Sequence, residues 1–178
     1  MYRKLISLLL LAAVGIVLLA GSLAEARGRA FFALVGITAF FGIGLAAHFF
    51  ALKKNPGGEE FGKCLPIMAV AVAGVAATWC LSVKLGLNTA VASGLVGLFA
   101  ALVLPGKLAA VAYTASFAGM SSLAVLTGLP MVICAGVLVG GFYILALPVY
   151  EGIGGKLGTM AAGAVLATVL IFSLLGGI

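Results

Sequence analysis

The sequence predicts an all-α protein, a polytopic bundle of about seven transmembrane helices. Of its 178 residues, 65% are hydrophobic and only 8% are charged, the mean hydropathy is +1.37, and the charges fall between long apolar segments. A soluble domain carries about 25% charged residues, so a surface this poor in ionised groups is expected to face hydrocarbon. The 26 glycines fit a membrane bundle, because small residues let helix backbones approach closely.

Seven apolar segments are long enough for transmembrane helices, which need roughly 20 residues with a range of about 17–25. Their expected bounds are 5–23, 30–52, 64–83, 88–104, 108–127, 130–149 and 157–175. Most connections are short, so consecutive helices are expected to pack as antiparallel neighbours. The longest connection, 53–63, is polar and rich in turn residues, and we interpret it as the main cytoplasmic loop. Residues 1–178 then form a single integral membrane domain.

The first segment has two interpretations. Arg3 and Lys4 precede an apolar stretch that ends at Ala24-Glu25-Ala26, which resembles a signal-peptide cleavage site. The stretch is longer than the usual signal core of about 7–15 residues, which favours a retained transmembrane helix. Cleavage would leave six helices.

The distribution of Lys and Arg predicts the orientation, because short cytoplasmic loops carry an excess of both. With the N-terminus inside, seven basic residues lie inside: Arg3, Lys4, Lys53, Lys54, Lys63, Lys107 and Lys156. Three lie outside: Arg27, Arg29 and Lys84. We therefore expect an integral protein of the cytoplasmic (inner) membrane, with its N-terminus inside and its C-terminus outside. Trp79 and Lys84 suit an anchor at the outer interface.

An internal repeat is also expected. Residues 96–105 match residues 139–148 at six of ten aligned positions, and each block is soon followed by Gly-Lys-Leu, at Gly106 and at Gly155. A weaker third copy of the turn is Gly62-Lys63. The bundle could therefore be built from two or three repeated helical hairpins in parallel orientation, unlike the inverted repeats of many transporters.

The scarcity of ionisable groups argues against several kinds of site. The chain has no Asp, and its four Glu residues all fall in expected loops, so neither a carboxylate proton relay nor a divalent-cation site is predicted. The three cysteines lack metal-ligand spacing. His48 is the single His, and a catalytic His would need a partner that the sequence does not offer. We therefore predict no enzyme, no metal and no cofactor. We expect His48 to be structural, with a pH-sensitive role as the alternative.

The Gly-Lys turns would place Lys63, Lys107 and Lys156 at the N-termini of outward-running helices. The free N–H groups and positive helix end there favour anions, so these lysines are candidates for contact with a solute anion or, more simply, with anionic lipid headgroups.

The segment 108–127 is the most polar, and Tyr113, Ser116, Gly119 and Ser122 are the candidates for lining a solute pathway. Ser116, Gly119 and Ser122 recur every three residues and can share one helix face, which could line a pathway or permit a local break in the helix. The alternative is close packing, with the hydroxyls bonded to carbonyls one turn back. Gly136 and Gly140 form a GxxxG helix-packing motif, which could act within the chain or against a second copy.

These features favour a small membrane transport protein, a channel, facilitator or permease subunit for a neutral or anionic solute. The alternative is a non-catalytic membrane subunit that binds or stabilises another membrane protein. The expected partners are membrane lipids and either further copies of the chain or another membrane subunit, and no nucleic acid.

Overall fold

The computed structural model describes residues 64–146 and 155–176, together with the isolated positions 13, 16, 17, 20 and 35. The chain divides into two compact units, Met1–Glu59 and Glu60–Ile178, and the helices described here belong to the second. In 64–146 and 155–176 there are five α-helices, one π-helical turn and no strand. They are α3 (Cys64–Trp79), η1 (Cys80–Lys84), α4 (Thr89–Val103), α5 (Gly106–Gly119), α6 (Leu129–Ala146) and α7 (Lys156–Leu174).

Local sequence explains where several helices begin. The Asn88 side chain caps α4 by accepting a hydrogen bond of 2.9 Å from the Ala90 N–H. Pro66 and Pro130 lie in the first turns of α3 and α6, where a backbone N–H has no helical partner. Gly155 precedes α7 with φ of +77°, a left-handed conformation that glycine adopts without steric cost.

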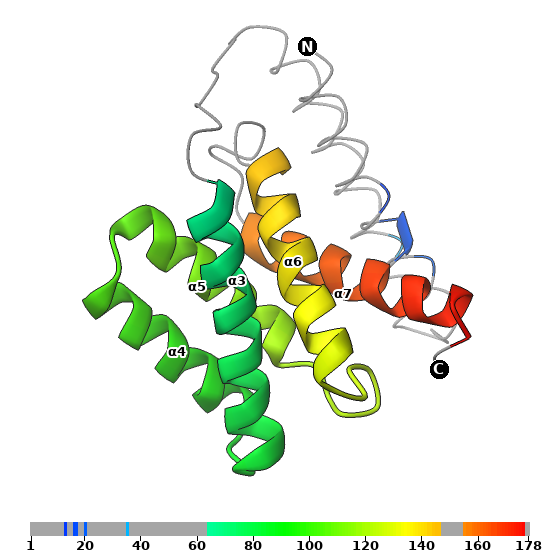
Figure 1. The fold of residues 1–178 in the computed structure, drawn as a ribbon, viewed down its shortest axis with the longest axis horizontal. Helices are drawn as coiled ribbons and strands as arrows, with labels where there is room; N and C mark the ends of the chain where they lie inside the picture. The colour runs from blue at the N-terminus through cyan, green and yellow to red at the C-terminus, as the bar shows by residue number, and fades with distance from the viewer. Residues whose placement is uncertain are drawn as a thin grey trace, which may run out of the picture. The chain divides into compact units, whose positions relative to one another are not determined.

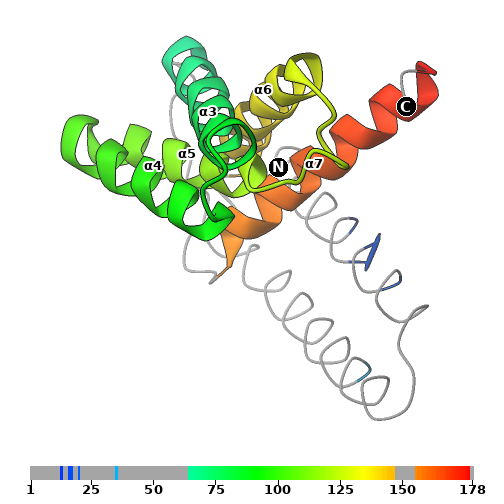
Figure 2. The same ribbon diagram turned by 90° about the horizontal axis from the view of Figure 1, so that it is seen from below.

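The central helix of this unit is α5. It contacts α3, α4, α6 and α7, while α3 packs against both α5 and α6. Figure 1 shows α3 and α6 side by side, with α5 running behind α3, α4 on one side and α7 extending to the other, and Figure 2 gives the view from below. The most polar of the predicted segments therefore forms the middle of the unit.

Of the five predicted segments that begin in the described residues, four agree closely with the helices as far as the structure describes them, but the segment 108–127 was predicted too long. We expected a helix over 108–127, whereas α5 ends at Gly119. Beyond Gly119 the backbone tightens, with the Met120 N–H bonded to the Phe117 carbonyl at 3.3 Å. The segment up to Gly128 is non-helical, yet it includes Leu126, whose side chain is fully buried. Hydropathy could not reveal this break, because the broken segment is as apolar as a helix.

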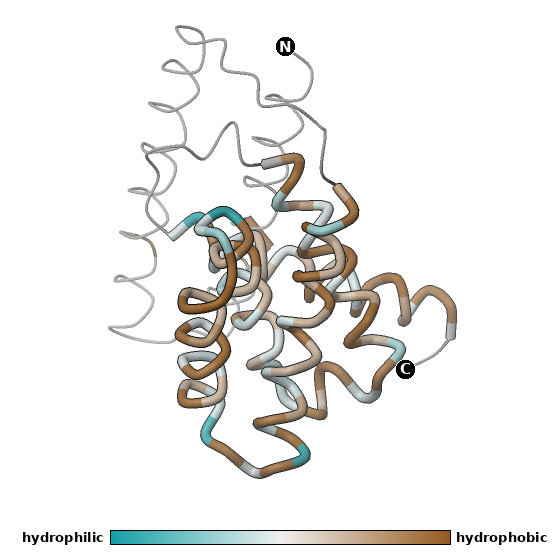
Figure 3. The backbone as a smooth tube through the Cα atoms, turned by 60° about the vertical axis from the view of Figure 1, so that its left-hand side comes forward, coloured by the Kyte–Doolittle hydropathy of each residue, from teal (hydrophilic) through white to brown (hydrophobic). Residues whose placement is uncertain are grey.

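The core of the unit differs in composition from its outer faces. Buried positions are rich in Ala and Gly and include five Ser and Thr side chains of the described residues, those of Thr78, Ser93, Thr114, Ser116 and Thr168. Large aliphatic and aromatic side chains lie exposed on the outer faces, among them Leu98, Phe99 and Leu102 of α4, Ile133 of α6 and Leu174 of α7. In Figure 3 the hydrophobic colour covers most of each helix, and the strongly hydrophilic residues lie near the helix ends.

Two helical stretches in the described residues are long and apolar enough to cross a membrane, Cys64–Lys84 and Lys156–Leu174. Two shorter apolar helices accompany them, Thr89–Val103 and Leu129–Leu145. The full set of seven predicted spans is thus not confirmed. The predicted spans 5–23 and 30–52, the loop 53–63 and the signal-like segment lie outside the described residues.

Candidate functional site

Ser116 of α5 lies in the contact between α5 and α4. Its side chain is fully buried, and its hydroxyl donates to the Tyr113 carbonyl at 2.8 Å. The Ser93 hydroxyl of α4 lies 2.8 Å from the Ser116 oxygen. Because the single Ser116 proton is used on the carbonyl, Ser93 is the donor between the two side chains. A buried side-chain hydrogen bond therefore links the two helices of this hairpin.

Gly119 ends α5 against α3. A Cβ atom placed on it would lie 2.6 Å from both the Thr78 Cβ atom and the Val75 carbonyl oxygen, closer than side chains approach. Gly74 makes the opposite contact, because its Cβ position is 2.9 Å from the Ala115 Cβ atom. Glycine thus sets the distance between α3 and α5 from both sides.

The four predicted pathway residues do not lie on one helix face. Ser116 faces α4 and Gly119 faces α3, while Tyr113 is 42% exposed and covers Gly97 of α4. Ser122 is exposed in the non-helical segment, because α5 has already ended. Ser122 therefore does not share a helix face with Ser116 and Gly119, although the three-residue spacing predicts that it does. A role of these residues in a pathway remains a prediction.

The GxxxG motif of α6 packs within the chain. The Cβ position of Gly136 lies 2.6 Å from the Val72 Cα atom, and that of Gly140 lies 2.6 Å from the Met68 sulfur. Both contacts are with α3, so the two glycines bring α3 and α6 into close contact.

Two of the three predicted anion or lipid contacts can be located. Lys107 lies in the first turn of α5 and is exposed, and Lys156 is the first residue of α7. Lys63 and His48 lie outside the described residues. Within 64–146 and 155–176 no group of three His, Cys, Asp or Glu side chains could hold a metal ion, and no disulfide joins the three cysteines. The lipid, anion and pH-sensing roles remain predictions.

Thr78 and Trp79, near the end of α3, were not predicted as site residues. Both side chains are buried, with exposures of 0% and 2%, yet the Thr78 Oγ1 and Trp79 Nε1 atoms have no hydrogen-bond partner among the described residues. An unpaired buried polar group costs about 1–3 kcal/mol. The expectation that Trp79 is an anchor at the outer interface remains a prediction, and the structure shows its ring covered by the protein. The neighbouring Lys84 ammonium lies 5.8 Å from the ring centroid, a cation–π contact.

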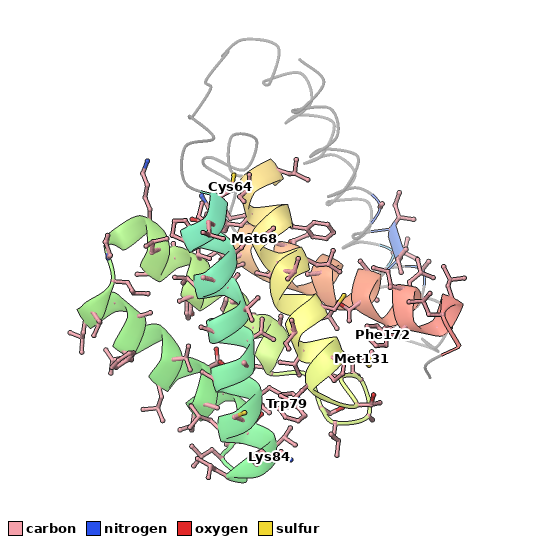
Figure 4. The ribbon with its side chains drawn as sticks, in the orientation of Figure 1. Cys64, Met68, Trp79, Lys84, Met131 and Phe172 are labelled. Carbon is pink, nitrogen blue, oxygen red and sulfur yellow. The ribbon has the colours of Figure 1, made fainter. Side chains whose placement is uncertain are left out.

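The backbone is irregular next to these two residues. Cys80–Lys84 forms a π-helical turn, in which the Leu85 N–H bonds to the Cys80 carbonyl at 3.1 Å. Such turns are rare and often accompany functional sites. The end of α5 at Gly119 lies against Thr78. In Figure 4 Trp79 lies at the same end of the unit as Met131, near the start of α6. A single polar residue in an apolar helix, next to Trp, was the only sequence signal for this site.

The helices that follow the three Gly-Lys pairs share two buried positions. The residues eight positions after the lysines are all 0% exposed: Ala71, Ala115 and Ala164. The residues twelve positions after them are also buried: Val75, Gly119 and Thr168. All three buried residues of α4, which are Ala92, Ser93 and Ala100, align with buried residues of α6, which are Ala135, Gly136 and Tyr143.

The helix pairs α4 and α5, and α6 and α7, are each in contact. Likewise α3 contacts α4 as α5 contacts α6, and α3 contacts α5 as α5 contacts α7. Comparison of the chain with protein-family models, with curated proteins and with solved structures found no match.

Proposed function

We propose that the chain is an integral membrane protein of seven transmembrane helices that moves a small neutral or anionic solute across the bilayer. The membrane part of the proposal is supported by the composition of the outer faces. Leu98, Phe99 and Leu102 of α4 are each more than 60% exposed. Water would penalise an exposed row of such side chains at about 25 cal/mol per Å², whereas lipid would not. The small residues and hydroxyls of the core also suit helices that pack within lipid.

The single observation that carries the transport proposal is the early end of α5. Its 14 residues rise about 21 Å, less than the roughly 30 Å of a hydrocarbon core. In a bilayer, part of the non-helical segment after Gly119 would then lie at membrane depth. Irregular backbone is tolerated there only where protein buries it or where it lines a water-filled cavity. Transporters place solute sites at such interrupted helices.

The repeated burial positions and helix contacts support a bundle of parallel hairpins. In that arrangement α3, α5 and α7 are equivalent helices, each beginning at a Gly-Lys turn on the cytoplasmic side. Lys63, Lys107 and Lys156 would contact lipid headgroups there or attract an anionic solute. Catalysis plays no part in this proposal.

Solute flux into liposomes tests the proposal. Purified protein reconstituted in lipid vesicles should pass at least one member of a panel of neutral and anionic solutes faster than protein-free vesicles do. Ser116→Ala and Ser122→Ala should slow that flux, whereas Ser173→Ala, an exposed hydroxyl at the end of α7, should leave it unchanged. Flux no greater than in empty vesicles for every solute would contradict the proposal.

Orientation is tested separately by labelling. In a background without the native cysteines, Lys107→Cys should react with a membrane-impermeant maleimide only from the cytoplasmic side. Lys84→Cys, on the opposite side of the bundle in the proposed topology, should react only from outside. The reverse result would invert the proposed topology.

A second candidate function is that of a non-catalytic membrane subunit. It is favoured by the outer face of α4, where Val91, Leu95 and Leu98 are exposed and Gly94 has no atom within 4 Å of its Cβ position. A small residue within an apolar stripe allows a second helix to pack closely. This function predicts that the protein co-purifies with one membrane partner or a second copy, and that Gly94→Leu abolishes the association.

A further inference from the structure

Two connections between helices lie at the same end of the unit. The π-helical turn after α3 ends at Lys84 and leads into residues 85–88, and α5 ends at Gly119 and leads into residues 120–128. Because Gly119 packs against Thr78, near the end of α3, the ends of α3 and α5 lie together. In Figure 4 Lys84 marks this end of the unit. The two connections, 85–88 and 120–128, form what we name the apolar end.

Large hydrophobic side chains are exposed at the apolar end. Leu85 is 70% exposed and Leu123 is 52% exposed, Leu87 and Val125 are exposed as well, and neither connection contains a charged residue. Gly, Asn and Ser in the two connections account for the turns, whereas the leucines are not needed for them. Water would penalise the exposed leucines by about 25 cal/mol per Å² of apolar surface. The composition therefore indicates surroundings other than bulk water.

The backbone of the apolar end bonds in part to the protein itself. The Leu85 and Leu87 N–H groups donate to carbonyls of the π-helical turn, each at 3.1 Å, and the Ser122 carbonyl accepts from Val125 and Leu126, each at 3.0 Å. Any N–H group that these turns leave unbonded could donate to ester carbonyls or water at the boundary between lipid headgroups and acyl chains, but would find no acceptor in hydrocarbon. The backbone therefore suits the membrane interface rather than the membrane centre.

The two helices that run between the apolar end and the opposite end are short. With 15 residues in α4 and 14 in α5, they rise about 22 and 21 Å, against roughly 30 Å for a hydrocarbon core. At the opposite end they are joined beside Lys107, which is exposed and whose charge would be costly within hydrocarbon. With Lys107 at one headgroup layer, α5 falls short of the other layer by about 9 Å. Residues 120–128 would then fill the remaining depth.

We infer that the apolar end is a lipid-binding surface, which inserts Leu85, Leu87, Leu123 and Val125 into the boundary between headgroups and acyl chains. The inference rests on the membrane part of the proposed function and extends the lipid contact from the helices to these connections. Lipid complements both features of the surface. Acyl chains cover the leucines, and a headgroup phosphate complements the exposed Lys84, which directly precedes Leu85.

Fluorescence quenching in lipid vesicles tests the inference. The full chain, with its native cysteines replaced by Ala, receives one new cysteine labelled with the fluorophore NBD. The test variants are Leu85→Cys and Leu123→Cys, which lie in different connections, so a folding defect in one leaves the other as a test. Gly106→Cys is the matched control at the opposite end, because Gly106 is also exposed between two helices and has no atom within 4 Å of its Cβ position. Leu98→Cys, on the outer face of α4, reports whether the helices contact lipid at all.

The vesicles contain phosphatidylcholine and phosphatidylglycerol, and two quenchers are compared. One is a nitroxide on the lipid acyl chain, and the other is iodide in water on both sides of the membrane. The labels at Leu85 and Leu123 should lose emission to the acyl-chain nitroxide and be protected from iodide. The label at Gly106 should lose emission to iodide and much less to the nitroxide.

The Leu98 label separates a failure of this inference from a failure of the proposed function. If the nitroxide quenches the Leu98 label while iodide quenches the labels at Leu85 and Leu123 as strongly as that at Gly106, the apolar end lies in water and only this inference is overturned. Protection of Leu85 and Leu123 from both quenchers would place a second copy of the chain on the surface and would also overturn it. If the Leu98 label is not quenched by the nitroxide either, the membrane proposal fails and this inference fails with it.

Discussion

Replacing Gly136 with Ala should separate α3 from α6 and destabilise the unit. The new Cβ atom would lie 2.6 Å from the Val72 Cα atom and 3.0 Å from its Cγ2 atom. The first of these is a backbone atom, so relief requires the two helices to move apart rather than one side chain to rotate. Gly141, on the same helix, has no atom within 4 Å of its Cβ position. Gly141→Ala is therefore the matched control.

The magnitude follows from two opposing effects. Placing Ala for Gly inside a helix stabilises it by roughly 0.5–1 kcal/mol, and this gain applies to both variants. Overpacking of a tight contact costs about 1–3 kcal/mol and applies only to Gly136→Ala. The common gain cancels in the difference, so Gly136→Ala should be less stable than Gly141→Ala by about 2 kcal/mol, roughly a 30-fold change in the unfolding equilibrium.

Denaturation in mixed micelles with increasing dodecyl sulfate measures this difference, and Trp79 on α3 reports the loss of packing through its fluorescence. We expect Gly136→Ala to unfold at a lower detergent fraction than the wild type and Gly141→Ala to unfold at an equal or higher one. Equal midpoints for the two alanine variants would refute the close contact between α3 and α6.

Three further outcomes are expected. A double-mutant cycle on Ser93 and Ser116 should give a coupling energy of about 0.5–1.5 kcal/mol, since the two hydroxyls share a buried hydrogen bond; an additive result in the same denaturation assay would contradict it. Lys84→Met should lower the free energy of unfolding by about 0.5–1 kcal/mol at most, because the cation lies at an exposed site. The same variant should alter the Trp79 emission, and spectra identical to the wild type would exclude the cation–π contact. If α4 faces lipid, Leu98→Lys should make the free energy of membrane insertion less favourable by about 2.5–3.5 kcal/mol. The membrane-bound fraction of expressed protein measures this change, and an unchanged fraction would indicate that α4 faces water.

Hydropathy and composition predicted the all-helical class and most helix positions in the described residues. The segments 64–83, 88–104 and 157–175 correspond closely to α3 with its π-helical turn, to α4 and to α7. These predictions depend on local properties, because a long apolar stretch that contains few helix breakers has little alternative to helix. Two helix starts also depend on local chemistry, since the Asn88 side chain caps α4 and Gly155 precedes α7 in a left-handed conformation.

The site residues were harder to predict. Ser116 stood out because it is polar in an apolar segment, but nothing in the segment indicates that it meets Ser93, 23 residues away. Gly136 and Gly140 were recognised as a packing motif, and only the fold identifies α3 as the helix that they contact. Thr78 was not predicted, since the hydroxyl of an isolated threonine on a helix ordinarily forms a hydrogen bond with a backbone carbonyl one turn earlier.

The sequence by itself determined that the described part of this chain is helical and strongly apolar, because helix formation and hydropathy depend on residues close together along the chain. Only the tertiary structure decided that α5 stops at Gly119, that Ser116 accepts a hydrogen bond from Ser93 of α4, and that Thr78 and Trp79 find no hydrogen-bond partner among the described residues. Each of these features depends on contacts between residues that are distant along the chain, because the distance between packed helix backbones decides which polar groups can form a hydrogen bond.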